Sequence, residues 1–318
     1  MMRSSRLLLP FALVVVAASL AAGVPRAAAT DPFPTGPSTL SSDHFQVHLS
    51  GDTSPCPTAT ITQEHAGDLL GMAERAYALY SNWGYTTPVP DSGDGLTDIS
   101  VDGFGTGCLT YGSIGIGVPV PLSRWDAVIT PVAPAGAGEI HLNAATGLGY
   151  HIVAHQVFHL FEDAVLPPDT NQWLHEGLAE WAAVRAESAI GGLEQNPDRT
   201  MDCVGSSCGD TEFDRNGYPG WMLFEYLAER FGDGAVKSVL DTSAATPALS
   251  GTQALSAVVQ PLGTTLGKFF EDYTTARMTG NFTSELLAAG VAADVSRTDL
   301  TAPSPKRSAR YSKSIHPG

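Results

Sequence analysis

The stretch that decides the fold runs from Tyr150 to Leu160 and reads YHIVAHQVFHL. Two of its histidines, His155 and His159, are four residues apart, so on a helix both imidazoles project from one face toward one point. The apolar neighbours predict that a helix over about residues 148–164 is buried, where an unpaired imidazole is unfavourable. The two histidines are therefore either satisfied core residues or ligands of a metal ion.

A second segment, Trp173–Trp181, reads WLHEGLAEW, and its apolar residues predict another largely buried helix. If this helix runs antiparallel to the first, Glu176 can reach a metal ion held by the two histidines. A two-His, one-Glu set leaves a fourth zinc position for water. Glu180 lies one turn further on, where its carboxylate would accept the free ring N–H of a ligating histidine. The alternative is two solvent-facing carboxylates, which the apolar neighbours disfavour.

Together the two segments resemble the zinc helices of the gluzincin metallopeptidases, whose HExxH motif is followed by a glutamate in an EGxAE segment. The chain is also similar to a group of secreted bacterial metalloproteases that carry an N-terminal DHFxVH strand. Further similar stretches are Asp43–His48, Gly84–Asp91 and Tyr226–Gly232. The resemblance thus extends over roughly residues 40–280.

This resemblance implies an α+β, zincin-like metallopeptidase fold over residues 43–285. It implies a small N-terminal mixed sheet, an edge strand packed on the metal-site helix and a helical C-terminal subdomain. It further implies Zn²⁺ as the cofactor, bound by His155, His159 and Glu176, and a peptide or protein as substrate or ligand. We expect the protein to be a monomer.

The chain departs from the family pattern at Gln156, where the family has its catalytic glutamate. That carboxylate takes a proton from zinc-bound water and delivers it to the leaving amine, whereas an amide cannot carry a proton. General acid-base catalysis contributes roughly 10²–10⁴-fold. Glu162 and Asp163 lie elsewhere around the helix and do not replace the missing group. We therefore expect a secreted metallopeptidase of weak or no activity, or a zinc-binding pseudopeptidase that binds a peptide or protein.

Two further assignments rest on the family layout. Tyr218, just before a predicted helix, resembles the tyrosine that stabilises the transition-state oxyanion in aminopeptidase-type gluzincins. It is equally well explained as an aromatic residue that packs at a helix start. The predicted strand Glu139, Ile140, His141, Leu142 and Asn143 resembles the edge strand on which substrate peptide lies by strand addition.

Three acidic residues near glycines, Asp91, Asp94 and Asp98, resemble a Ca²⁺ loop. They lack the alternating ligands and the distal glutamate of an EF-hand, so a plain turn is the simpler interpretation. His151 shares the helix face of His155 and His159 one turn earlier. We interpret it as a residue behind the ligands or at the surface rather than as a ligand.

Composition limits the classes of function. The 318 residues are 43% apolar and 16% charged, which predicts one large folded domain, alone or with a small appendage. Acidic residues outnumber basic ones, 33 to 17, for a net charge of −16. A chain this acidic is repelled by phosphate backbones, so nucleic-acid binding is disfavoured.

The first 29 residues have the features of a secretory signal peptide. Arg3 and Arg6 precede an apolar run, Leu7–Ala22, and Ala27–Ala29 supplies a small-residue cleavage pattern. The alternative is a membrane anchor, but this run is shorter than the roughly 20 residues that span a bilayer. We expect a secreted, extracellular protein that has no membrane segment after the signal is removed.

Export makes the four cysteines candidates for disulfides. Cys203 and Cys208 enclose a short loop and are expected to pair locally, which leaves Cys56 with Cys108. A zinc ribbon is the competing interpretation, but Cys56 and Cys108 each stand alone.

Hydrophobic periodicity predicts the remaining elements. An extended lead over 30–42 precedes a strand at 43–49 and a helix at 64–83. Short strands are expected at 97–101, 128–130 and 139–143, and helices at 148–164, 173–188, 220–231, 235–240 and 262–277. The C-terminal tail, 286–318, is basic from about residue 302 and lacks an apolar period, which predicts disorder.

Overall fold

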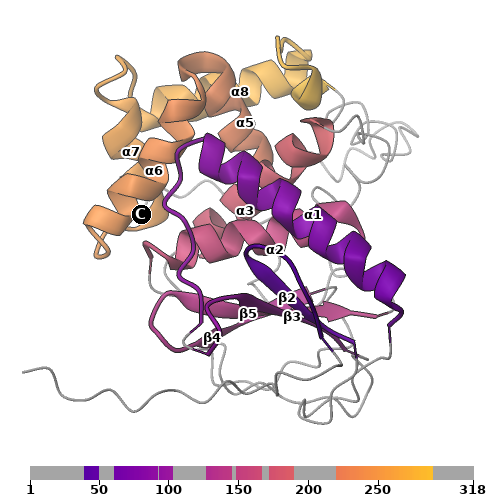
Figure 1. Cartoon of the computed structure of the whole chain (residues 1–318). Helices are drawn as coiled ribbons and strands as arrows, with labels where there is room; N and C mark the ends of the chain where they lie inside the picture. The colour runs from indigo at the N-terminus through magenta and orange to yellow at the C-terminus, as the bar shows by residue number, and fades with distance from the viewer. Residues whose placement is uncertain are drawn as a thin grey trace, which may run out of the picture.

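The computed structural model describes residues 39–49, 61–91, 93–102, 127–144, 148–166, 172–189 and 220–288. The predicted signal peptide, the four cysteines, Tyr218 and the tail beyond residue 288 lie outside these residues, so the expectations for them stay predictions. The expected start of the disordered tail is wrong, because Leu286 and Leu287 are buried against the core. Within the described residues the protein is α+β, with one small mixed sheet and a larger set of helices (Figure 1).

Five strands form the sheet, in the order β1-β2-β3-β5-β4. The three central strands run parallel, while β1 and β4 lie antiparallel at the two edges. The bounds are β1 Thr39–Ser41, β2 Phe45–His48, β3 Thr97–Asp102, β4 Ala127–Val132 and β5 Ala137–Asn143. The expected mixed sheet is therefore present.

Two expectations for the sheet are wrong. The strand that contains Glu139–Asn143 is not at the edge, because β5 pairs with β3 on one side and with β4 on the other. The edge belongs to β4, in which Pro131 has no N–H to donate, as is usual for a proline at a sheet edge. The predicted lead also ends early, because Thr39–Ser41 pairs with β2. Strand order depends on contacts between distant segments, which an alternating pattern does not encode.

The helices are α1 Gln63–Asn82, α2 Tyr150–Asp163, α3 Gln172–Ala189, α5 Trp221–Phe231, α6 Asp233–Ala245, α7 Gly251–Val259 and α8 Leu266–Thr279. Helix α7, which begins with a capping box between Ser250 and Gln253, was not expected from the sequence. Helix α8 begins later than the periodicity predicts. Gly263 has a φ of 87°, so the chain turns there, and the Thr265 side chain then caps α8.

The two faces of the sheet differ in polarity. A Cβ added at Gly138 of β5 would lie 3.2 Å from the Leu160 side chain, so the face that carries Ile140 and Leu142 looks toward α2. The opposite face carries buried polar side chains, namely Gln46, His48, Asp98, Ser100, Asp102, Glu139, His141 and Asn143. The apolar face thus forms the core with α1 and α2.

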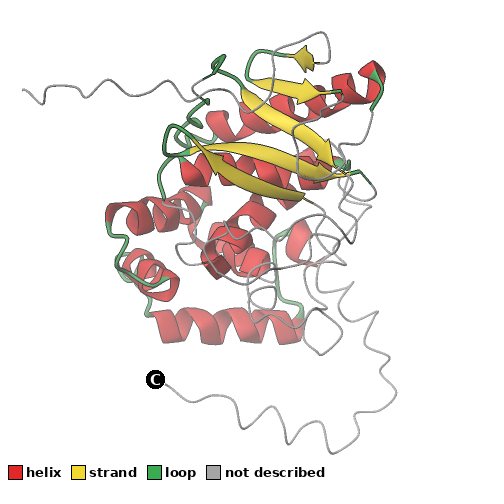
Figure 2. Ribbon diagram, turned by 90° about the horizontal axis from the view of Figure 1, so that it is seen from below, coloured by secondary structure: helices red, strands yellow, loops and turns green. Residues whose placement is uncertain are grey.

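α2 and α3 lie side by side in the middle of the molecule, between the sheet and the helices α5 to α8 (Figure 1). They run antiparallel, since His151 contacts Glu187, His155 contacts Glu180, and His159 contacts Glu176. The buried Tyr80 hydroxyl of α1 donates to the carbonyl of Ala154 at 3.1 Å and ties α1 to α2. Figure 2 shows the molecule from below, with a face of the sheet toward the viewer and helices behind it.

None of the described helices combines the length and hydropathy that a membrane-spanning helix requires.

Candidate metal centre

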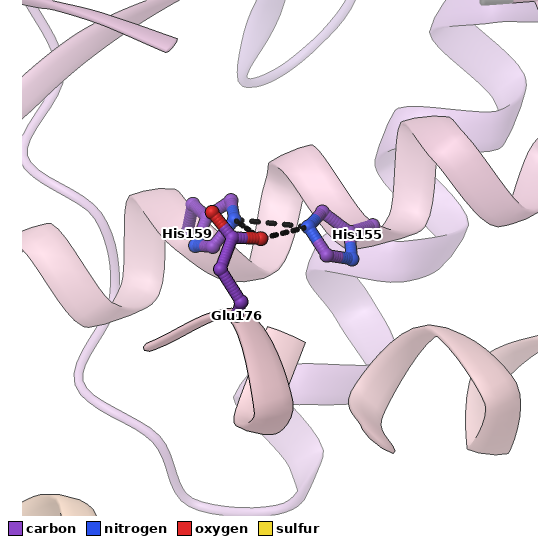
Figure 3. Close-up of side chains that lie close together, drawn as sticks. All are labelled: His155, His159 and Glu176. Carbon is purple, nitrogen blue, oxygen red and sulfur yellow. Dashed lines mark hydrogen bonds and ion pairs between the residues drawn. The ribbon is translucent and has the colours of Figure 1, made fainter. Parts of the chain in front are cut away.

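Three potential metal ligands meet between α2 and α3. Nε2 of His155 lies 3.0 Å from Nε2 of His159 and 3.2 Å from Oε2 of Glu176, and the His159 and Glu176 atoms are 3.5 Å apart. Figure 3 shows the carboxylate of Glu176 reaching across from α3 to both rings on α2. The structure thus brings together the three residues that the sequence singled out as ligands.

The ring orientations favour a shared ligand. The imidazoles of His155 and His159 are T-shaped, with planes at 84° and centroids 4.6 Å apart. Because an imidazole lone pair lies in its ring plane, planes that cross let both Nε2 lone pairs point at one ion. One ion held by two imidazoles and a carboxylate has the donor set of a zinc site with an open fourth position.

Each of the two rings also meets a carboxylate on its far side. Nδ1 of His155 lies 3.1 Å from Oε2 of Glu180, and Nδ1 of His159 lies 2.7 Å from Oε2 of Glu162. An Nδ1–H that donates to a carboxylate fixes the tautomer in which Nε2 keeps its lone pair. Glu180 lies where the sequence analysis expected it. Glu162 was missed, although its spacing three residues after His159 is the signal that could have identified it.

The charges around the site favour a cation. Burial opposes ionisation of Glu176 and Glu180, but the nearby imidazoles hold the pKa of Glu176 well below its usual value and that of Glu180 at about 2. Burial lowers the pKa of His159, yet the charge of Glu176 and the contact with Glu162 raise it well above the usual value. Burial raises the pKa of Glu162 to about 8, although the contact with His159 and the charge of that ring lower it.

A second group of possible ligands shares His159, namely His159, Glu162 and His175. Here the rings of His159 and His175 are stacked, with planes at 13° and centroids 4.9 Å apart. Lone pairs in nearly parallel planes do not converge on one ion. Glu162 instead lies next to Nδ1 of both rings, at 2.7 and 3.3 Å. Burial and the charge of His159 lower the pKa of His175 to about 3, so this ring is neutral. His175 was not among the residues predicted from the sequence to belong to the site.

Gln156, which follows His155 directly, is buried in α2. Its Oε1 has no hydrogen-bond partner. The nearby carboxylate of Glu162 contacts Nδ1 of His159, which is on the opposite side of that ring from Nε2. The Glu162 carboxylate therefore lies away from the point where the two Nε2 atoms converge.

His151 does not reach the three converging ligands. Its Nε2 lies 3.0 Å from Oε1 of Glu180, and its Nδ1 lies 3.0 Å from Oε2 of Glu187. His151 is thus linked to His155 indirectly, because both rings contact the Glu180 carboxylate.

The Ca²⁺ expectation is not supported. Asp91 and Asp94 each accept a backbone N–H of their own loop, from Gly93 and Leu96 at 2.8 and 2.9 Å. Asp98 accepts from Nε2 of His48 at 2.7 Å on the polar sheet face. Among the described residues, the groups of side chains that converge as possible metal ligands do not include these aspartates. The loop is held by its own hydrogen bonds.

The residues expected to form a substrate edge strand have other partners. His141 lies between two carboxylates, with Nδ1 2.8 Å from Asp102 and Nε2 3.5 Å from Glu139, on the sheet face turned away from α2. Burial lowers the pKa of His141, but these two carboxylates outweigh it and raise the pKa to about 9. Because β5 is paired on both sides, residues 139–143 cannot accept an added strand.

In comparisons with known proteins, no protein-family model and no curated protein matches the chain. One similar solved structure is a point-mutated M1 zinc metallopeptidase from Deinococcus radiodurans, with a TM-score of 0.39 and 17% identity. The match covers 74% of this chain and 51% of that structure, so the chain spans about half its length.

Proposed function

We propose that this protein is a zincin-like, metallopeptidase-type zinc protein whose Zn²⁺ ligands are His155, His159 and Glu176. The observation that supports it best is the convergence of two Nε2 atoms and one carboxylate oxygen within 3.5 Å of one another. Carboxylates on both Nδ1 atoms complete the arrangement that zinc-binding histidines usually have.

A zinc ion at this position would polarise a peptide carbonyl and lower the pKa of a bound water molecule. The side chains around the site limit the chemistry that it can support. Glu176 supplies a charged ligand, and Glu180 and Glu162 orient the two imidazoles. Gln156 can donate or accept a hydrogen bond, but it cannot take up a proton. Peptide hydrolysis is therefore weak or absent.

The second candidate function is peptide or protein binding by a pseudopeptidase. Gln156 favours it, because an amide in place of the general base removes proton transfer while the three ligand side chains remain together. The edge strand β4 is the place where a bound peptide would add to the sheet by backbone hydrogen bonds. We infer an extracellular activity from the predicted signal peptide, and the acidic surplus argues against nucleic acid as the partner.

The test is zinc stoichiometry together with peptidase activity on the mature protein, purified without added chelator. We expect about one zinc ion per chain in the wild type. His155→Ala and Glu176→Ala should each lose most of it. The matched control is His44→Ala, because His44 forms an exposed pair with Glu74 at 2.8 Å on other elements.

Equal zinc content in the wild type and in His155→Ala would refute the site. Turnover of an unstructured protein substrate at background would support the binding function. Strong turnover that a chelator abolishes would instead show an active peptidase with a different base.

A further inference from the structure

His151 occupies a position that the proposed zinc chemistry does not explain. It lies on α2 one turn before His155, and both of its ring nitrogens contact carboxylates of α3. The two contacts are 3.0 Å each, to Oε1 of Glu180 and to Oε2 of Glu187. A ring whose two nitrogens both face carboxylates is an imidazolium that donates twice.

The charge balance agrees with this geometry. Burial lowers the pKa of His151, but the charges of Glu180 and Glu187 and the contacts with them raise it to about 10. His151 therefore remains a cation between two anions at neutral pH, and it joins two turns of α3 to the start of α2.

The position of the Glu180 carboxylate depends on His151. Both of its oxygens are used, Oε1 by His151 and Oε2 by Nδ1 of His155. Glu180 is 3% exposed, so water cannot readily replace a lost partner. Without His151, one oxygen would be left unpaired in the interior, and the carboxylate would be free to turn away from His155.

The carboxylate that contacts the other histidine, Glu162 beside His159, does not depend on a residue such as His151 for its position. Glu162 lies three residues after His159 on the same helix, and it is fully buried. Its position relative to His159 is set by the helix itself. Glu180 is on a different helix from His155, so its position depends on contacts across the α2–α3 interface.

We propose that His151 is a positioning residue for the metal centre, which with Glu187 holds Glu180 in the orientation that fixes the tautomer of His155. The inference rests on the proposed zinc site and assigns His151 no direct contact with the ion. Residues behind metal ligands typically change metal affinity by about 10–100-fold when they are replaced. Because His151 acts through Glu180, we expect the lower end of this range.

The experiment is a double-mutant cycle on zinc affinity. The dissociation constant for zinc is measured by competition with a chromophoric chelator in four full-length mature proteins: wild type, His151→Phe, Glu180→Gln and the double variant. Phenylalanine keeps a flat ring but cannot donate. We expect His151→Phe to raise the dissociation constant about tenfold in the wild-type background. In the Glu180→Gln background, His151→Phe should change the zinc dissociation constant little further, because the Glu180 carboxylate on which His151 acts is already gone.

Two more variants separate positioning from general destabilisation. Glu187→Gln keeps the size of the side chain but weakens its contact with His151. This variant should therefore raise the zinc dissociation constant by a smaller factor than His151→Phe does. This variant also provides the test if His151→Phe does not fold. His44→Phe removes an exposed histidine that pairs with Glu74, and it should leave the zinc affinity unchanged.

A visible spectrum of the Co²⁺-substituted protein reports the ligand geometry directly. It should shift in His151→Phe but not in His44→Phe. An unchanged zinc dissociation constant in folded His151→Phe or Glu187→Gln would overturn the inference. So would equal effects of His151→Phe in both backgrounds, since that result means a structural role independent of Glu180. A wild type that binds no zinc would instead refute the proposed function.

Discussion

The imidazole of His155 stands at 84° to that of His159, and their Nε2 atoms are 3.0 Å apart. Two nitrogen lone pairs at this distance repel each other unless a cation lies between them. A proton can fill that role, and so can a metal ion. The geometry therefore predicts that protons and zinc compete for the site.

Removal of the metal should destabilise the protein. If zinc binds only the folded state, a free zinc concentration of 100 times the dissociation constant stabilises the folded protein by about 2.7 kcal/mol. A chelator should therefore lower the Tm of the wild type measured by calorimetry. The Tm of His155→Ala should not respond, and an equal response in both proteins would mean that the chelator acts elsewhere.

Zinc affinity should fall as the pH falls. The pKa of His159 is raised well above its usual value, mainly by Glu176, so zinc binding near neutral pH must displace a proton. The dissociation constant should change by about tenfold per pH unit for each proton released. Titrations at about pH 6 and about pH 8 test this, and a pH-independent constant would contradict it.

Gln156→Glu should create or raise metal-dependent peptidase activity. The substitution restores a proton carrier and leaves all three ligands untouched, so zinc content should stay the same. The expected gain is roughly 10²–10⁴-fold on one unstructured protein substrate, with a chelator control. Equal chelator-sensitive turnover in both forms would show that another group already serves as the base. No turnover in either form would point to binding alone.

Asp91→Asn should stabilise the protein at neutral pH. Burial and the charge of Asp98 raise the pKa of Asp91 from 3.8 to about 6, so the ionised form is disfavoured in the folded state. The loss of folding free energy caused by the ionised Asp91 carboxylate is absent below about pH 4, grows as the pH rises and is complete above about pH 6. Screening by nearby solvent limits it to about 1 kcal/mol. We expect a Tm increase of about 2–4 °C at neutral pH and none at about pH 4. A gain at both pH values would contradict this explanation.

Gly251→Ala should destabilise the protein. A Cβ at this position would lie 2.7–2.8 Å from the ring of Trp173, which is stacked on Phe224 with planes at 7°. Overpacking of this kind costs about 1–3 kcal/mol. Gly267→Ala is the matched control, since it is also in a first helical turn and its Cβ would meet nothing within 4 Å. Denaturant unfolding should show a loss for Gly251→Ala and a gain of up to about 1 kcal/mol for Gly267→Ala. Equal effects would refute the clash.

Much of the local structure follows from the sequence because it depends on short-range geometry. The spacing of His155 and His159 places both rings on one helix face, whatever the helix packs against. Apolar periodicity located α1 to within one residue at each end. It failed at α7, where a short helix follows a capping box and contains little charge to mark its polar face.

The sequence by itself determined the types and the spacing of the three candidate ligands, and that Gln156 follows the first of them. Only the tertiary structure decided that β4 rather than β5 is the edge strand, because strand order depends on pairing between distant segments. The same holds for the partners behind the ligands. Spacing alone cannot show that His151 meets Glu180 and Glu187, because the antiparallel packing of α2 on α3 sets those contacts.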